Sequence, residues 1–221
     1  MDLGIAIRTT GSVRRFTDEP VSDAVLYELL DDARFAPSGG NRQCWRVVVV
    51  RDRDRRAALG QLMRPVWDEY VAMAGSGQTP FTSVAPASTT LTTVTPGSTP
   101  NDLLDGIADV PVVLVVAADL AYVAMMDKDL DRPAITGGGS IYPFCWNLLL
   151  AARSRGLGGV MTTFLSRAEH AAAEVLGLPA TYALAATVFI GRPVHQPTKL
   201  KRAPVEQFTT IDRFDGPAFS G

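Results

Sequence analysis

Two arginines and a serine near the amino terminus form the first group of residues with the chemistry of a binding site. Ser12, Arg14 and Arg15 stand close together in GSVRRF, ahead of the first long amphipathic segment. A guanidinium group pairs its N–H donors with two phosphate oxygens, and a hydroxyl adds another donor. The stretch therefore predicts a phosphate-binding segment. The alternative is a solvated pair of arginines that forms ion pairs with Asp18 or Glu19.

A second polar group lies in APSGGNRQCW, residues 36–45. Its two adjacent glycines let the backbone come close to a ligand. The side chains of Ser38, Asn41 and Gln43 supply donors and acceptors, as the polar edge of a heterocycle requires. An ordinary helix end followed by a turn is the alternative, because Pro-Ser-Gly-Gly-Asn also satisfies the chemistry of a turn.

A basic stretch near the carboxyl end, KLKRAP, is the third group. Lys199, Lys201 and Arg202 carry the charge needed to close on a phosphate from the far end of the chain. A solvated basic loop explains the same residues.

Several kinds of active site have no counterpart in the sequence. It contains no GxSxG, HExxH, Walker or kinase motif, and no GxGxxG between a strand and a helix. His170 and His195, the two histidines, are interpreted as surface residues rather than catalytic ones. Cys44 and Cys145 have no metal-ligand spacing and indicate neither a disulfide framework nor a zinc site, so no metal is expected. If the chain is an enzyme, a bound cofactor is expected to carry the chemistry.

The overall charge and hydropathy exclude two classes of partner. Lys plus Arg total 21 and Asp plus Glu total 23, which gives a net charge of −2 and no broad attraction to nucleic acid or anionic membranes. The longest apolar run, 110–118, is too short to span a bilayer, and the amino terminus lacks the pattern of a signal peptide. We expect a cytoplasmic protein that binds neither nucleic acid nor membrane.

Hydrophobic periodicity predicts the elements that position these groups. A helix over 21–36 has Ser22 as its cap and Pro37 as its stop, and a helix over 52–70 is expected to be interrupted at Pro65. The remaining predicted elements are helices over about 140–156 and 167–176 and strands over 45–51, 109–118 and 182–190. Few strands and several helices favour an α/β or α+β fold with a small mixed sheet.

Two segments stand apart from this pattern in what we expect to be a single domain over 1–221. Residues 75–101 are rich in Gly, Ser, Thr and Pro, and a connection of that length is usually a functional lid or disordered. We expect a variable, lid-like loop, with disorder as the alternative. The tail over 204–221 has alternating apolar positions without an obvious partner, so we expect it to pack across a dimer interface.

The order of these motifs along the chain resembles the nitroreductase family of FMN-dependent oxidoreductases. The resemblance is carried by the Arg-bearing segment near residue 14, APSGGNRQCW, NLLLAARSRGLGGVMTT, and GRP followed by KRAP. It covers the first fifty residues and roughly residues 109–206. It implies an α+β, three-layer fold with a small central mixed or antiparallel sheet flanked by helices, and an intertwined homodimer with FMN at its interface.

The resemblance also implies which residues hold the cofactor. Ser12, Arg14, Arg202 and, less directly, Arg15 correspond to the phosphate-binding residues of the family. The flavin contacts would come from Pro37, Ser38, Asn41 and Gln43, and the backbone near flavin N5 from Met161, Thr162 and Thr163. No catalytic side chain is implied, because flavin N5 carries the chemistry.

Two departures from the family pattern affect the expected site. Thr10 and Gly11 occupy a region where relatives commonly have an arginine, so Arg8 is a substitute candidate for the phosphate. Cys44 stands where most relatives have proline between Gln43 and Trp45. A loop without that proline is expected to be looser.

The family chemistry implies an enzyme that uses NAD(P)H to reduce a small nitroaromatic or quinone-like acceptor. NAD(P)H, a transient co-substrate, passes hydride to flavin N5 and leaves before the acceptor binds, in ping-pong order. The alternatives are an FMN-dependent dehydrogenase or dehalogenase of a specific metabolite, and a non-catalytic protein that binds or stores flavin.

Overall fold

A single antiparallel sheet forms the centre of the computed structural model, which describes residues 1–83, 97 and 99–221. Its strands are β1 (Trp45–Val49), β2 (Val112–Asp119), β3 (Gly158–Thr162) and β4 (Tyr182–Gly191), in the order β1-β2-β4-β3. Each neighbouring pair is antiparallel. The expected α+β class is confirmed, and the sheet is antiparallel rather than mixed.

β2 explains why the sheet has a core on both faces. All eight of its residues are buried. Val112, Leu114 and Val116 face one apolar cluster, whereas Val113 and Val115 face the other. Side chains of a strand alternate between the two faces of a sheet, so a continuous apolar run such as this one must be covered on both.

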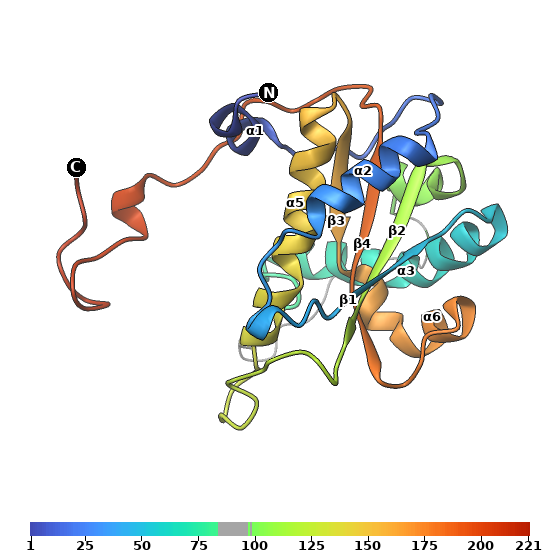
Figure 1. Ribbon diagram of the computed structural model, residues 1–221. Helices are drawn as coiled ribbons and strands as arrows, with labels where there is room; N and C mark the ends of the chain where they lie inside the picture. Colours follow the sequence, from blue (N-terminus) through green and yellow to red (C-terminus); the bar gives the residue numbers. More distant parts are fainter. Residues whose placement is uncertain (84–96, 98) are drawn as a thin grey trace.

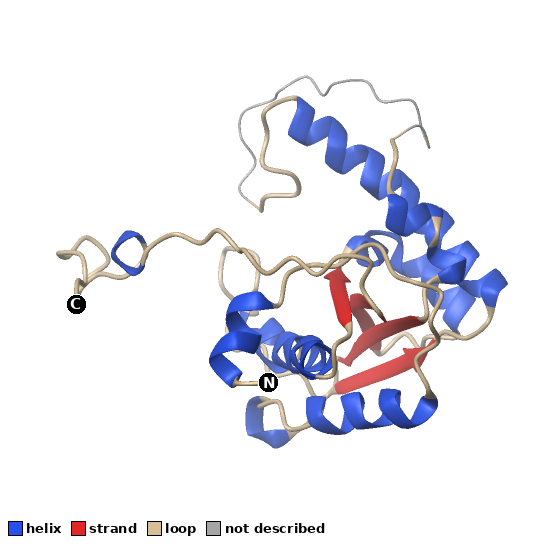
Figure 2. Cartoon of the chain, turned by 90° about the horizontal axis from the view of Figure 1, so that it is seen from above, coloured by secondary structure: helices blue, strands red, loops and turns tan. Residues whose placement is uncertain are grey.

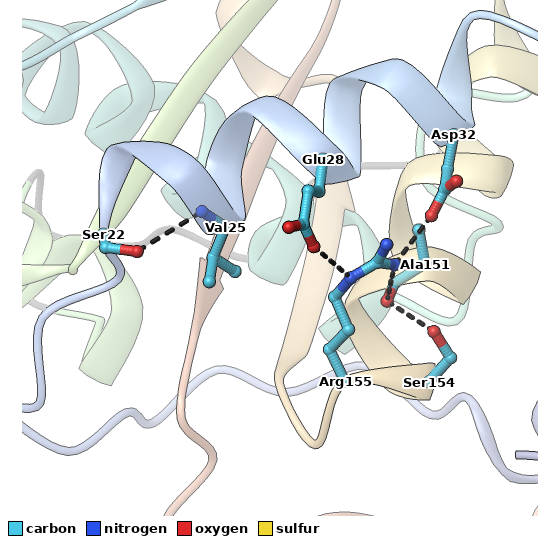
Figure 3. A network of polar contacts seen from close by, with 7 residues as sticks. All are labelled: Ser22, Val25, Glu28, Asp32, Ala151, Ser154 and Arg155. Carbon is cyan, nitrogen blue, oxygen red and sulfur yellow. Dashed lines mark hydrogen bonds and ion pairs between the residues drawn. The ribbon is translucent and has the colours of Figure 1, made fainter.

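Two helices, α2 (Asp23–Ala33) and α5 (Tyr142–Ser154), cover one face of the sheet (Figure 1). Ser22 caps α2 as predicted, since its Oγ accepts the Val25 N–H at 3.3 Å. Arg155, just after α5, reaches α2 and pairs with Glu28 at 3.3 Å and Asp32 at 2.7 Å (Figure 3). These exposed ion pairs help to orient α2 relative to α5, whereas the buried Leu29 and Leu148 stabilise the contact between the two helices.

The opposite face is covered by α3 (Arg53–Gly75) and α6 (Glu169–Leu176). The expected interruption at Pro65 is wrong, because α3 continues through it. Proline removes the hydrogen bond to the carbonyl four residues earlier. Pro65 and Gln61 are both exposed, so water can satisfy the Gln61 carbonyl.

Two further helices and one strand were not predicted. α1 (Leu3–Thr9) begins at Asp2, whose Oδ1 accepts the Ile5 N–H at 3.1 Å, and α4 (Asp102–Asp105) is capped by Asn101. The strand that was not predicted is β3, which contains two glycines that lower its β propensity. It nevertheless pairs with β4 along its whole length.

The carboxyl-terminal segment leaves the body of the molecule and extends away from it (Figures 1 and 2). Its apolar side chains lie in solvent: Phe208 is 69% exposed and Phe214 is fully exposed. The predicted lid-like loop over 75–101 falls largely on residues 84–96 and 98, which lie outside the described residues.

Candidate functional site

A pocket of about 720 Å³ lies between the amino-terminal segment, the end of β3 and α3. It brings together six of the predicted site residues: Ser12, Arg14, Arg15, Met161, Thr162 and Thr163. The rest of its wall comes from Val13, from α3, from residues 101–103 at the start of α4, from Phe164 after β3, and from Val194 and His195 after β4. Segments from both ends of the sequence therefore meet at one site.

Backbone pairing places the segment with Ser12 and Arg14 against β3. The Val13 N–H donates to the Gly159 carbonyl at 2.9 Å, and Ser12 forms a parallel bridge with Gly159. The approach needs glycine, since a Cβ at Gly158 would lie 2.6 Å from Val13 Cγ2. One at Gly159 would lie 2.6 Å from the Phe189 carbonyl oxygen. The Gly-Gly pair at the start of β3 is thus what lets the two walls of the pocket meet.

The polar part of the pocket carries more positive than negative charge. Arg14 and Arg15 line it together with one carboxylate, Asp102, and the His195 imidazole adds a further polar group. Arg15 and Asp102 form an exposed ion pair at 3.6 Å. The predicted alternative partner of the arginines, Glu19, instead accepts two hydrogen bonds from Arg192, which lower its pKa. Such a set of donors suits an anionic group.

Aromatic side chains form another part of the wall. Trp67 and Tyr70 project from successive turns of α3, with ring centroids 5.6 Å apart and nearly parallel planes. Phe164, directly after Thr163, lies 6.0 Å from Trp67 and 6.2 Å from Tyr70. Offset and edge contacts at these separations are favourable for aromatic rings. The pocket therefore combines phosphate-type donors with a surface suited to a planar ring.

The turn over 37–43 does not line this pocket. Pro37, Asn41 and Gln43 are exposed and Ser38 is half-buried. Ser38 Oγ accepts the Gln43 N–H at 2.9 Å, and Gly39 donates its N–H to Ser140 Oγ at 3.0 Å. Asn41 and Gln43 have φ values of 53° and 48°, in the left-handed region that few non-glycine residues adopt. Local turn bonds thus fix a strained, solvent-facing loop.

Arg202 is the remaining predicted phosphate-binding residue, and it too lies outside the pocket. It is exposed, and its Nη1 donates to the neighbouring Lys201 carbonyl at 2.7 Å. It belongs to the segment that leads from the body into the extended tail.

Trp67, Tyr70, Phe164, Asp102 and His195 line the pocket and were not predicted as site residues. His195 was interpreted as a surface residue, and it is indeed exposed, but on the pocket wall. The spacing of Trp67 and Tyr70 places them on one side of a helix, which the sequence alone does not distinguish from a core-facing side. Nothing local in the sequence marks the other three.

Within the described residues, no group of three or more His, Cys, Asp or Glu side chains could hold a metal ion. None of the described helices is long and apolar enough to cross a membrane. Cys44 and Cys145 are buried and unpaired, and burial raises the pKa of Cys145 to about 12. Neither thiol is placed to act as a nucleophile.

Known proteins share both the sequence pattern and the fold. The family model named "Nitroreductase family" matches residues 7–192. The chain is 30% identical to a "NADH dehydrogenase" of Thermus thermophilus over 94% of each chain. It is 27% identical to a "Putative NADH dehydrogenase/NAD(P)H nitroreductase" of Archaeoglobus fulgidus, over 85% of this chain and 83% of the relative.

Solved structures share the fold at lower identity. An NADPH:FMN oxidoreductase of Vibrio harveyi complexed with NAD⁺ superposes with a TM-score of 0.68 at 21% identity, covering 95% of this chain and 76% of that one. A nitroreductase-like family protein of Bacillus cereus has a TM-score of 0.66 at 22% identity and covers 96% and 97%. The predicted resemblance is confirmed, and the chain belongs to the nitroreductase family of oxidoreductases.

Proposed function

We propose that the chain is an FMN-dependent NAD(P)H oxidoreductase that reduces nitroaromatic or quinone-like acceptors. The observation that carries this proposal is the composition of the pocket wall. Ser12 and Arg14 stand on one segment, and the aromatic rings of Trp67, Tyr70 and Phe164 on others. A ligand that joins a phosphate to a planar ring uses both parts. The Vibrio harveyi neighbour, an NADPH:FMN oxidoreductase, supports the choice of FMN and NAD(P)H.

The pocket fits such a ligand in size and in chemistry. Its volume of about 720 Å³ lies in the range of small-molecule sites, roughly 300–1,000 Å³. Arg14 and Ser12 would hold the phosphate, with Arg15 shared between the phosphate and Asp102. Met161, Thr162 and Thr163 would present the end of β3 to the ring, and Trp67 would cover the ring with an apolar surface.

Bound FMN would supply the redox chemistry, by taking up hydride from NAD(P)H at N5 and releasing it to the acceptor. The protein's own residues bind, orient and exclude water. Arg14 and Ser12 fix the phosphate end, and the aromatic wall limits the face open to solvent. Positioning of this kind needs no acid, base or nucleophile from the chain. The proposal therefore requires no catalytic dyad or triad in the pocket.

We further propose that the site is completed in a homodimer. Pro37, Ser38, Asn41 and Gln43 form an exposed turn outside the pocket of their own chain, and Arg202 stands at the base of the tail. A second copy of the chain would bring this turn to the flavin. The exposed apolar residues of the segment over 204–221 would pack on that copy, because so much exposed apolar surface is costly in a monomer.

Steady-state kinetics test the reaction order. Initial rates with NADH or NADPH and a quinone, each varied at several fixed concentrations of the other, should give parallel double-reciprocal lines. The same open pocket would then serve both substrates in turn. Intersecting lines would show that both bind at once and would contradict the ping-pong scheme. FMN that binds but is reduced by neither nucleotide would favour the dehydrogenase or dehalogenase alternative.

A further inference from the structure

Gln196 lies behind the pocket, directly after His195 in the loop that follows β4. Its Nε2 is 3.3 Å from the Thr9 carbonyl oxygen and 3.5 Å from that of Gly11. The same atom lies 3.3 Å from the carbonyl oxygen of Pro197. One side-chain amide thus links the loop after β4 to the residues that lead directly into Ser12.

The orientation of this amide follows from its surroundings. Three carbonyl oxygens surround Nε2, and each can only accept a hydrogen bond. A reversed amide would place Oε1 against all three. In the observed orientation Oε1 is buried and has no hydrogen-bond partner within the described part of the chain. An unpaired buried oxygen is unfavourable, so the favourable contribution of Gln196 comes from its Nε2 bonds.

Close packing on both sides leaves Gln196 little freedom. A Cβ at Gly158 would lie 3.0 Å from Gln196 Oε1, so the amide rests directly on the first residue of β3. A Cβ at Gly11 would lie 2.8 Å from Pro197 Cβ. Gln196 therefore fills the space between β3 and the segment of Thr9 and Gly11. That segment leads into Ser12, and both it and β3 thus continue into residues of the pocket wall.

We propose that Gln196 is a positioning residue for the phosphate group of the cofactor. It fixes the backbone before Ser12 relative to β3, so that Ser12 and Arg14 stand at a set distance from Met161–Thr163. Gln196 does not line the pocket and would not touch the flavin ring. This inference rests on the proposed binding of FMN. It requires that loss of Gln196 reduces the contribution of the phosphate group to FMN affinity. The contribution of the flavin ring to that affinity should not change.

Riboflavin, which lacks the phosphate, separates this role from a general loss of structure. The dissociation constants of FMN and riboflavin are measured for wild type, Gln196→Leu and Gln196→Glu at one pH and one salt concentration. Leucine removes the donors at similar size, and glutamate replaces them with acceptors. Gln61→Leu, on the exposed face of α3, is the matched control.

We expect the Kd for FMN to rise roughly tenfold or more in both Gln196 variants, since more than one hydrogen bond is lost. The Kd for riboflavin should stay within about twofold, and the control should match wild type. Variants that keep the wild-type ratio of the two constants overturn the proposal, even when both constants rise together. If Gln196→Leu and Gln196→Glu do not fold, the same measurement is made on Gln196→Asn, which keeps an amide on a side chain too short to reach the same carbonyl groups.

The proposed function and the proposed role of Gln196 are contradicted by different results. A wild-type protein that binds neither flavin removes the proposed function, and this role of Gln196 with it. A wild type that prefers FMN to riboflavin, together with Gln196 variants that keep that preference, contradicts only the role of Gln196.

Discussion

Val13 donates its backbone N–H to the Gly159 carbonyl at 2.9 Å, and this contact joins the amino-terminal segment to the edge strand β3. Ser12, Val13 and Arg14 all line the pocket, and the Val13 side chain is buried against Gly158. The polar wall of the site is therefore part of the packed sheet. Its geometry depends on two glycines that carry no chemical group of their own.

Substitution of Gly159 tests this dependence. In Gly159→Ala the new Cβ would meet the Phe189 carbonyl oxygen at 2.6 Å and Leu149 Cδ2 at 2.8 Å. We expect a loss of about 1–3 kcal/mol in the free energy of unfolding, together with weaker FMN binding, because β3 must move. Urea denaturation measures the first effect. Gly139→Ala, where nothing lies within 4 Å of the new Cβ, is the control and should be nearly neutral.

Arg14 and Arg15 should contribute unequally to cofactor affinity. Arg15 already pairs with Asp102 at 3.6 Å, whereas no ion pair of Arg14 is found among the described residues. Loss of a charged hydrogen bond costs about 1.5–3 kcal/mol, which corresponds to roughly 10- to 100-fold in Kd. We expect Arg14→Gln to raise the Kd for FMN by that factor and Arg15→Gln by less.

Fluorescence titration with FMN gives the order of the two effects. Arg55→Gln, an exposed arginine on α3 outside the pocket, should leave the affinity unchanged. Equal losses of FMN affinity in Arg14→Gln and Arg15→Gln would show that the ion pair with Asp102 does not reduce the contribution of Arg15 to binding.

Removal of the tail tests the proposed dimer. A chain that ends at Pro204 lacks the exposed Phe208, Ile211, Phe214 and Phe219. We expect the full chain to be a dimer and the truncated chain to dissociate more readily and to bind FMN more weakly, since the turn over 37–43 would then lose its partner. Light scattering on a sizing column reports the mass. A truncated chain that stays dimeric with full FMN affinity would contradict the role given to the tail.

Asp127 predicts a pH dependence of stability. Its buried carboxylate accepts hydrogen bonds from the Thr136 hydroxyl at 2.5 Å and from the Ile135 N–H at 2.9 Å, and it pairs with Arg132. These contacts hold the pKa of Asp127 far below its usual value, with the Thr136 bond as the largest cause. An aspartate in an unfolded chain has a pKa of about 3.9. The stabilisation is therefore full above about pH 4 and is lost as the pH falls below it.

Asp127→Asn should accordingly unfold at a lower urea concentration than wild type at pH 7, and the difference should narrow as the pH is lowered below about 4. Asp129→Asn, an exposed neighbour whose ion pair among the described residues is with Lys128, serves as the control and should have little effect at either pH. If the difference in stability between Asp127→Asn and wild type is independent of pH, the charge of Asp127 is not what stabilises the segment over 127–136.

Periodicity was sufficient for most elements of the fold. The helix over 21–36 and the strand over 109–118 were predicted because each has a continuous apolar face and a clear boundary, such as the Ser22 cap. β3 was missed because two of its five residues are glycines. Those glycines serve tertiary packing against Val13 and Phe189, which no local pattern reveals.

The site was predictable only in part for a similar reason. The family motifs led to Ser12, Arg14 and Met161–Thr163, which the structure brings together. Trp67 and Tyr70 look like core residues of a helix, and only the packing of α3 against the segment over 164–168, which follows β3, turns them towards the pocket. The turn over 37–43 has the family sequence, yet it lies outside the pocket of its own chain. Its predicted contact with the flavin therefore depends on the proposed dimer.

The most direct measurement is an anaerobic titration of the purified protein with NADH and NADPH. We expect a yellow protein that releases FMN on denaturation, and loss of the oxidised flavin absorbance when either nucleotide is added. Subsequent addition of a quinone should restore that absorbance. A colourless protein that takes up no added FMN would contradict the central claim.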